Sequence, residues 1–404
     1  MIEESVRTPT VSGRARSTPA SPIRKLTPYA DAARARGTSV FQMNIGQPDF
    51  PTPSPILQAV QSFPRSVLAY APSSGLPEAR AAWSEYYRRQ GFEVPEEEVL
   101  VTIGGSEAIQ FAIAAVADPG DNILVFEPTY TNYVGFAAGT SVELKPIALD
   151  ASNGYALPSL EEVARAVDPR TRALLLCNPN NPTGSVYDAS TMSGFVTLAE
   201  RHGLFLIVDE VYREFVYDGR SRVSVLALAP RSPHVIMVDS VSKRFNACGA
   251  RVGCFTTANQ EVFQGAMRQA QARLSAPTVE QLAVIPMLRD PLPYTIPLVA
   301  DYQGRRDAVM RHLRVIPGAR YSEPQGAFYM VVRLPIDDSE AFARWLLESF
   351  SDQGETVFVA PMPGFYVTPG QGRDEVRLAF VLEETRLARA AALLRLGVEQ
   401  YGQH

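Results

Sequence analysis

The stretch of sequence that decides the fold is Val235–Arg244, which reads VIMVDSVSKR. Its first four residues are apolar, and a short continuous apolar run is typical of a buried strand in a parallel sheet. Lys243 follows in the loop after that strand, beside Ser240 and Ser242. Ligands of open α/β sheets bind at this edge, where a lysine can form a Schiff base and the serines can bind phosphate oxygens. A lone loop lysine is, however, more often merely solvated.

Short apolar runs and longer helical stretches alternate on both sides of this stretch. Strands are expected at Val40–Ile45, Val99–Ile103, Asn122–Glu127, Ala173–Cys177, Leu204–Val208, Val235–Asp239 and Val252–Phe255. Helices are expected at Tyr29–Arg36, Leu76–Gln90, Glu107–Ala117, Leu160–Ala166 and Ala189–Arg201, with a long helical region at Gln260–Met287. This alternation predicts an α/β domain with a mainly parallel sheet flanked by helices.

The pattern changes after about residue 290. Helices are expected at Tyr302–Leu313, Ser339–Phe350 and Thr385–Val398, and strands near Ala327–Val332 and Val376–Phe380. This arrangement indicates a smaller α+β domain. Residues 1–19 are rich in Ser, Thr, Pro and Arg, which favours a disordered or loosely attached tail.

Composition narrows the classes of function. The 404 residues are 46% hydrophobic and 20% charged, which is typical of a soluble globular protein, and a net charge of −5 argues against nucleic-acid binding. No apolar stretch approaches the roughly 20 residues that span a bilayer. Three cysteines without metal-ligand spacing favour reduced thiols in the cytoplasm, and the histidines lack partners at metal or triad spacing, so no metal site is expected.

Three more polar motifs each follow an apolar run. Asp209 ends the run LFLIV and is followed three residues later by Tyr212, while the turn-rich stretch NPNNPTG occupies residues 178–184. Residues 104–107, which read GGSE, lie between a strand and a helix, where backbone N–H groups can bind a phosphate. Taken singly, each has a plainer explanation as a helix cap or a turn.

Their order and shared position after strands make a specific combination. Asn-Pro-Thr-Gly (181–184), Asp-x-x-Tyr (209–212), Ser-x-x-Lys (240–243) and Arg251, eight positions after the lysine, resemble the motifs of class I/II aminotransferases of pyridoxal-phosphate (PLP) fold type I. The resemblance runs from about Ser21 to the C-terminus. It implies an enzyme that exchanges an amino group between an L-amino acid and a 2-oxo acid by ping-pong chemistry.

The resemblance also implies catalytic roles. Lys243 matches the lysine that holds PLP as a Schiff base and carries the proton between Cα and C4′. Asp209 matches the acid that keeps the pyridine nitrogen protonated, so that the ring withdraws electrons. Tyr212 and Asn181 match the hydrogen-bond donors to the phenolic oxygen of the ring.

Further positions match residues that bind the phosphate, the ring or the substrate. Phosphate binding is implied for Gly105, Ser106, Glu107, Ser240, Ser242 and Arg251. Tyr130 matches the aromatic residue stacked on the ring, and Tyr70 matches a tyrosine that reaches the cofactor of the partner subunit in a homodimer. Arg377 and the backbone of Gly46 match contacts to the substrate α-carboxylate, and QGAFY at 325–329 resembles a strand of the family's small domain.

The substrate side chain is less well indicated. One bacterial group of aspartate aminotransferases has a lysine where this chain has Ser106, so we expect L-aspartate to be a poor donor. Arg24 lies on a segment that can fold over the active site and contact the substrate side chain, although a surface basic pair with Lys25 is an equally good interpretation. Residues 360–367 are a further candidate contact.

Two alternatives stay open. Other fold-type-I enzymes, such as lyases, cyclases or oxidases, use the same lysine, and some transcription regulators borrow this fold. The second alternative is less favoured because every catalytic position is filled and no DNA-binding segment is visible. We expect a tail at 1–20, a segment at 21–58 that contributes to the small domain and an active-site lid, a large PLP-binding domain at 59–294 and a small domain at 295–404.

Overall fold

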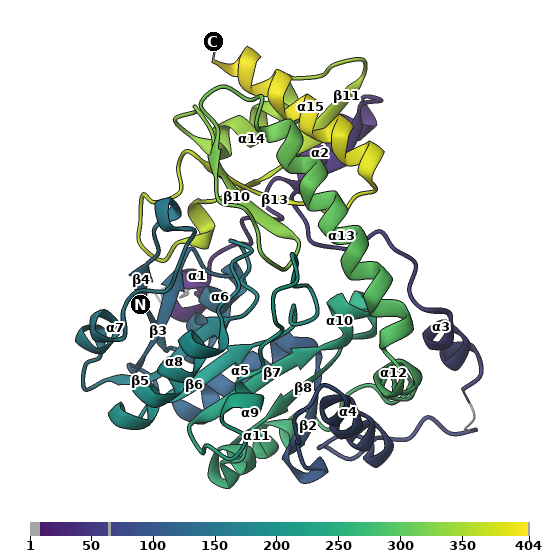
Figure 1. Ribbon diagram of the computed structural model, residues 1–404, viewed down its shortest axis with the longest axis vertical. Coiled ribbons are helices and arrows are strands. Elements are labelled where there is room, and N and C mark those ends of the chain that lie inside the picture. The colour runs from purple at the N-terminus through teal and green to yellow at the C-terminus, as the bar shows by residue number, and fades with distance from the viewer. Residues whose placement is uncertain (1–8, 64–65, 403–404) are drawn as a thin grey trace, which may run out of the picture.

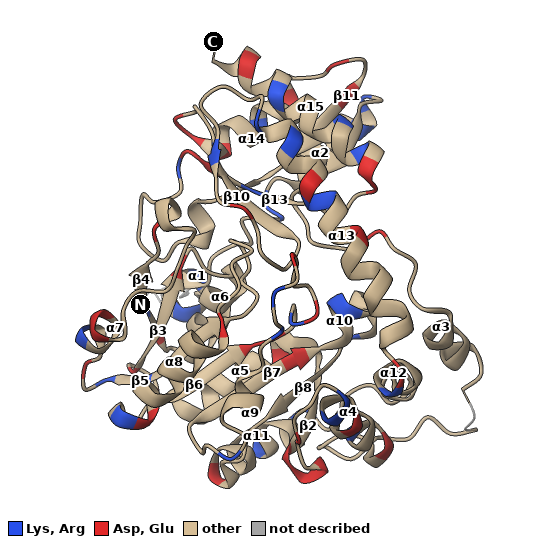
Figure 2. Ribbon diagram, in the orientation of Figure 1, with Lys and Arg blue, Asp and Glu red and all other residues tan. Residues whose placement is uncertain are grey.

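The structure is a computed structural model that describes residues 9–63 and 66–402. It has a larger part built around a wide sheet and a smaller part that carries the C-terminus (Figure 1). The long helix α13 (Leu292–Leu313) runs from one part to the other. Basic and acidic residues are interspersed over the outer helices, and no helix within the described ranges is both long and apolar enough to cross a membrane (Figure 2).

The larger part contains a seven-stranded sheet in the order β2-β8-β7-β6-β5-β3-β4. Its strands are β2 (Val99–Ile103), β3 (Asn122–Glu127), β4 (Glu143–Ala148), β5 (Thr171–Cys177), β6 (Phe205–Asp209), β7 (Val235–Ser240) and β8 (Val252–Thr256). All neighbours are parallel except β8, which is antiparallel to both β2 and β7. The predicted mainly parallel α/β sheet is therefore confirmed.

Helices cover both faces of this sheet. One face packs against α5 (Gly104–Val116), which contacts α6 (Thr131–Thr140) and α11 (Gln260–Ala272). The other face carries α4 (Pro77–Arg89), α7 (Leu160–Ala166), α8 (Ala189–His202), α9 (Val225–Leu228) and α12 (Thr278–Arg289), the last in contact with α3 (Ser54–Gln61). Successive strand residues alternate between the two faces: Ile207 packs with the α5 side, and Leu206 and Val208 pack with the α4 side.

The smaller part has its own hydrophobic core. Its antiparallel sheet has the order β12-β13-β10-β9, with β9 (Arg320–Tyr321), β10 (Tyr329–Arg333), β12 (Ala360–Pro361) and β13 (Glu375–Ala379). Strand β1 (Ser39–Gln42) pairs with β11 (Glu355–Phe358), so a segment near the start of the sequence is part of the same small sheet as a segment near its end. The remaining helices are α1 (Gly13–Ser17), α2 (Thr27–Ala35), α10 (Val241–Arg244), α14 (Ser339–Glu348) and α15 (Glu384–Tyr401).

Several predicted elements differ from the structure for identifiable reasons. Strand β4 was not expected; it lies at the sheet edge, and its half-exposed residues do not form an apolar run. The expected helical region from 260 to 287 is two helices, because Leu274 adopts a left-handed φ of 75° and Pro277 precedes α12. Helix α13 begins at Leu292, ten residues earlier than expected, and contains Pro297.

The N-terminal tail is only partly described. Residues 1–8 of the predicted tail lie outside the described residues. Residues 13–17 form the short helix α1, which contacts α6 but buries none of its side chains. All five residues are exposed, so the expectation of a disordered or loosely attached tail stays a prediction.

Candidate active site

A pocket of about 770 Å³ opens where strands β5, β6 and β7 end. It lies at the carboxyl edge of parallel strands, the usual place for ligands in open α/β sheets. The pocket brings together residues from the large sheet, the start of α5, the N-terminal segment and the small part. Of the predicted site residues, its walls include Arg24, Gly46, Gly105, Ser106, Tyr130, Asn181, Asp209, Tyr212, Ser240, Ser242, Lys243, Arg251 and Arg377.

Lys243 enters the pocket from the short helix α10, whose first turn is capped by Ser240 through a 3.2 Å hydrogen bond from the Ser242 amide. The Lys243 Nζ donates to the Gly46 carbonyl at 2.9 Å and lies 3.7 Å from the Cys248 sulfur. The chain has only two other lysines, Lys25 and Lys145, which form ion pairs with Glu340 and Asp168. Lys243 is thus the lysine whose amine is available inside the pocket.

Asp209 ends β6 and is oriented to the α5 face of the sheet, like Ile207 two residues earlier. Its carboxylate accepts a 2.7 Å hydrogen bond from the Tyr133 hydroxyl and a 3.2 Å bond from the Val211 amide. Burial raises the pKa of Asp209 to about 6, against these hydrogen bonds, which lower it. A cationic partner in the pocket would hold this carboxylate in its ionised form.

Arg377, on β13, is 1% exposed and has no carboxylate partner among the residues that the structure describes. Its Nη2 donates to the Asn44 carbonyl at 2.6 Å and its Nη1 to Asn181 Oδ1 at 3.1 Å, while Nε has no partner. The guanidinium lies 4.4 Å from the centre of the Tyr329 ring. A buried cation with only neutral acceptors is expensive, which indicates that an anion completes its shell.

The glycine-rich turn before α5 makes room for a group at the helix start. A Cβ on Gly253 would lie 2.6 Å from the Gly104 carbonyl carbon and 2.8 Å from the Gly105 nitrogen, so β8 can approach this turn only without a side chain. Arg251 adopts a left-handed φ of 52° and donates from Nη1 to the Cys248 carbonyl at 3.1 Å. The hydroxyls of Ser240 and Ser242 lie 2.9 Å apart on the adjacent wall.

Two predicted site residues lie elsewhere in this chain. The Glu107 side chain accepts from the Ile103 amide at 2.8 Å and from Arg273 Nε at 3.1 Å, so its carboxylate caps α5 and does not line the pocket. Tyr70 is 80% exposed and lies outside the pocket walls. Glu107 is compatible with phosphate binding only through its backbone. Tyr70 is compatible with a contact to a cofactor only if that cofactor belongs to a second subunit.

Sequence reasoning missed several residues of the pocket wall, among them Asn132, Tyr133, Cys248 and Tyr329. The Tyr329 hydroxyl lies 3.0 Å from that of Tyr212, and Asn132 Nδ2 donates to the Tyr130 hydroxyl at 2.9 Å. Tyr133 lies one helical turn after Tyr130, and that spacing is the signal that could have pointed to it. In the described ranges, no cluster of His, Cys, Asp or Glu is arranged to hold a metal ion.

Comparison with known proteins places this chain in a family. Residues 38–394 match the family model described as aminotransferase class I and II. An aspartate/prephenate aminotransferase of Thermus thermophilus is 32% identical over 88% of this chain and 90% of the relative, and an LL-diaminopimelate aminotransferase of Desulforudis audaxviator is 32% identical over 92% and 96%. A solved alanine aminotransferase from Pyrococcus furiosus superposes with a TM-score of 0.88 at 29% identity, covering 97% of this chain and all of that chain.

The predicted family, cofactor and PLP fold type I are therefore confirmed. The chain belongs to the aminotransferase class I and II family and is a PLP-dependent enzyme that transfers an amino group between an amino acid and a 2-oxo acid.

Proposed function

We propose that the pocket around Lys243 is the active site and that Lys243 holds PLP as a Schiff base. The observation that carries this assignment is the meeting of three groups in one pocket: the Lys243 amine, the buried Asp209 carboxylate and the Arg377 guanidinium without a carboxylate partner. An amino acid substrate carries a carboxylate, and PLP carries an aldehyde and a basic ring nitrogen. The Lys243 amine can react with the aldehyde, the Asp209 carboxylate can pair with the protonated ring nitrogen, and the Arg377 guanidinium can bind the substrate carboxylate.

The wall near α5 fits the phosphate of the cofactor. Ser240 and Ser242 offer hydroxyls, Arg251 offers a guanidinium, and the turn at Gly105 and Ser106 lies at the N-terminal end of α5, where amide groups and the helix dipole favour an anion. Any Cβ on Gly253 would press on this turn, so the close approach of the strand is part of the fit. We propose backbone contacts alone for Glu107.

When bound, PLP supplies an electron-withdrawing ring that stabilises negative charge on the substrate Cα. We propose that Lys243 Nζ takes and returns the Cα proton and that Asp209 holds a proton at the ring nitrogen. Tyr212 and Asn181 would donate hydrogen bonds to the phenolic oxygen of the bound cofactor, and Tyr130 would pack against its ring. Arg377 and Gly46 orient the α-carboxylate so that the Cα–H bond faces the lysine.

The donor amino acid is proposed from two residues of the pocket wall, Arg24 and Ser106. Arg24 reaches the pocket from the segment at residues 21–24, and Ser106 stands where one group of aspartate aminotransferases has a lysine. Relatives of similar identity are mostly named for aspartate, some of them for prephenate as well, and others are named for LL-diaminopimelate or alanine, so their names favour aspartate and stand against the Ser106 argument. We propose that Arg24 contacts donors with a distal polar or charged group and that aspartate is a poor donor.

The proposed division of the chain has a tail at 1–20, a segment at 21–58 that provides the lid, a large domain at 59–294 and a small domain at 295–404. Separate hydrophobic cores and the pairing of β1 with β11 support this division. Ser21, Ile23 and Arg24 in the pocket wall support the lid. We also propose a cytoplasmic location, on the basis of three free cysteines, two of them buried.

We further propose a homodimer with composite active sites. Exposed apolar residues gather on one stretch of chain, where Leu57, Val60, Val67, Leu68 and Tyr70 are each 46% exposed or more. Such a concentration marks an interaction surface. A two-fold partner that covers it would bring Tyr70 to a second pocket and complete the phosphate contacts there.

The Asp209→Asn variant tests the proposed role of the acid. We expect it to fold and to bind some PLP, but to remove the Cα proton on the order of 100-fold or more slowly, because an uncharged amide does not hold the ring nitrogen protonated. The measurement is loss of deuterium from a Cα-deuterated donor in single turnover. Asp188→Asn, at the cap of α8, is the control. A rate for Asp209→Asn near that of wild type would reduce the acid to a packing role.

Arg377→Ala and Arg24→Ala separate the two ends of the substrate. Loss of Arg377 should lower kcat/KM for every donor by a similar factor, about 100-fold, because every amino acid presents the α-carboxylate. Loss of Arg24 should lower kcat/KM only for donors with a distal polar group. The measurement is kcat/KM for aspartate, glutamate, an aromatic, an aliphatic and a basic donor. A uniform loss in Arg24→Ala would make Arg24 structural, and a strong preference of wild type for aspartate would contradict the Ser106 argument.

Tyr70→Phe and light scattering test the composite site. Wild type should have the mass of a dimer or a larger assembly. Tyr70→Phe should keep that mass and its melting temperature but release PLP faster on dialysis, because one donor to the phosphate is missing. A fully active monomer would refute the composite site.

A further inference from the structure

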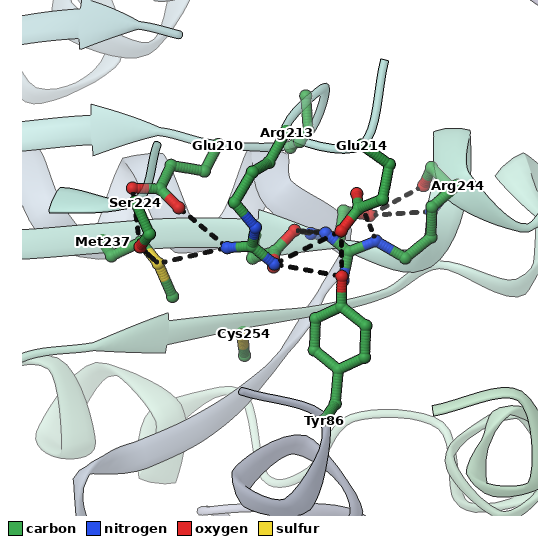
Figure 3. Close-up of polar contacts among 12 residues, drawn as sticks. Tyr86, Glu210, Arg213, Glu214, Ser224, Met237, Arg244 and Cys254 are labelled. Carbon is green, nitrogen blue, oxygen red and sulfur yellow. Dashed lines mark hydrogen bonds and ion pairs between the residues drawn. The ribbon is translucent and has the colours of Figure 1, made fainter. Parts of the chain in front are cut away.

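Five buried charged side chains form one network behind the wall of the pocket (Figure 3). We call Glu210, Arg213, Glu214, Asp239 and Arg244 the buried ion-pair network; each is at most 3% exposed. Charges so deeply buried are costly unless they are paired. None of the five lines the pocket.

Asp239 is the centre of the network. Its Oδ1 accepts from Arg244 Nη2 at 2.5 Å and its Oδ2 from Arg213 Nη2 at 3.1 Å. Arg244 Nε continues to Glu214 Oε2 at 3.0 Å, and Arg213 Nη1 to Glu210 Oε2 at 2.7 Å. These contacts tie the segment that follows β6 to the segment that ends β7 and starts α10.

Both tied segments carry residues of the proposed active site. Glu210 follows Asp209 directly, and Arg244 follows Lys243 directly. Asp239 packs on the α4 side of the sheet, as Met237 does, while Asp209 faces the α5 side. The network therefore connects, on the α4 side of the sheet, the two segments whose side chains meet in the pocket.

The network also carries charge. Three carboxylates face two guanidinium groups, so the ionised network has one net negative charge. Burial is the main cause of the raised pKa of Asp209, and the Asp239 charge raises it further. Removing one charge from the network therefore changes how strongly the pocket holds protons.

Other titratable groups face these residues from every neighbouring element. On the network side they are Tyr86, Tyr87, Cys254 and Arg222; on the Asp209 side they are Tyr130, Tyr133, Cys177 and Lys243. Tyr86 donates to Glu214 and accepts from Arg213 Nη2 at 3.1 Å, and the Arg244 guanidinium lies 4.5 Å from the centre of its ring. Tyr86 can be changed to phenylalanine without altering the charge of the network.

We propose that Arg244 and Asp239 are positioning residues of the reaction. Through the buried ion-pair network they hold Asp209 and Lys243 in register and set the electrostatic potential of the pocket. This inference rests on the proposed roles of Asp209 and Lys243. It predicts that changes of opposite charge in the network shift the proton affinity of the pocket in opposite directions.

The test uses the PLP-loaded enzyme and four variants: Arg244→Met, Arg244→Lys, Asp239→Asn and Tyr86→Phe. The first readout is the pH midpoint at which the visible absorption band of the bound cofactor changes. The second is the melting temperature, which reports a purely structural contribution. Arg244→Lys keeps the charge, and Tyr86→Phe removes hydrogen bonds without changing any charge.

Arg244→Met leaves the network more negative, so the pocket binds its proton more tightly and the midpoint moves to higher pH. Asp239→Asn makes the network neutral, and the midpoint moves to lower pH. Each shift should be on the order of half a pH unit or more for a charge change so close to the site. Arg244→Lys should stay within a fraction of that shift, and Tyr86→Phe should lower the melting temperature without moving the midpoint.

Equal midpoints in all variants, or shifts of the same sign in Arg244→Met and Asp239→Asn, would overturn the proposal and leave the network a structural device. If Arg244→Met does not fold, the other two variants decide: Asp239→Asn must lower the midpoint while Arg244→Lys leaves it nearly unchanged, and any other result overturns the proposal. If the enzyme kept its visible band after Lys243 is replaced, that result would instead refute the proposed function. The two failures are therefore distinguishable.

Discussion

The proposed active site depends on the edge at which the neighbouring parallel strands β6 and β7 end. The register pairs Asp209 with Val238, so the residues that follow each strand emerge side by side. Because side chains alternate across a sheet, this edge presents Asp209 and Ser240 to the α5 side and Asp239 to the opposite side. The α5 side of this edge therefore lines the pocket, while the opposite side carries the buried ion-pair network, which connects the same two backbone segments.

Burial gives the site its chemistry. A carboxylate on the surface would stay ionised without help, but Asp209 has a raised pKa and thus gains from a cationic neighbour. Arg377 lies among Asn44, Asn181 and Tyr329, which leave its charge uncompensated. In the proposed function both residues bind groups of opposite charge, which PLP and an amino acid provide. The apolar environment makes each of these pairings stronger than it would be in water.

Much of this could be predicted from the sequence. The apolar runs before Asp209, Asn178 and Ser240 predicted β6, β5 and β7, and the resemblance to class I/II aminotransferases pointed to the pocket residues that local patterns alone left ambiguous. Strand β4 was missed because an edge strand needs no apolar run. The Glu107 carboxylate is turned from the pocket by Arg273, which lies far along the chain. The pairing of Arg244 with Asp239 depends likewise on tertiary packing, which no local pattern encodes.

The central claim is that Lys243 is the residue that binds PLP. The direct measurement is borohydride reduction of the PLP-loaded enzyme, followed by digestion and mass spectrometry of the labelled peptide. Because the chain has only three lysines, the result is unambiguous. The structure predicts the label on Lys243, whose amine lies in the pocket, and none on Lys25 or Lys145, which are held in ion pairs. Stoichiometric label on Lys25 or Lys145, with Lys243 unmodified, would contradict the account.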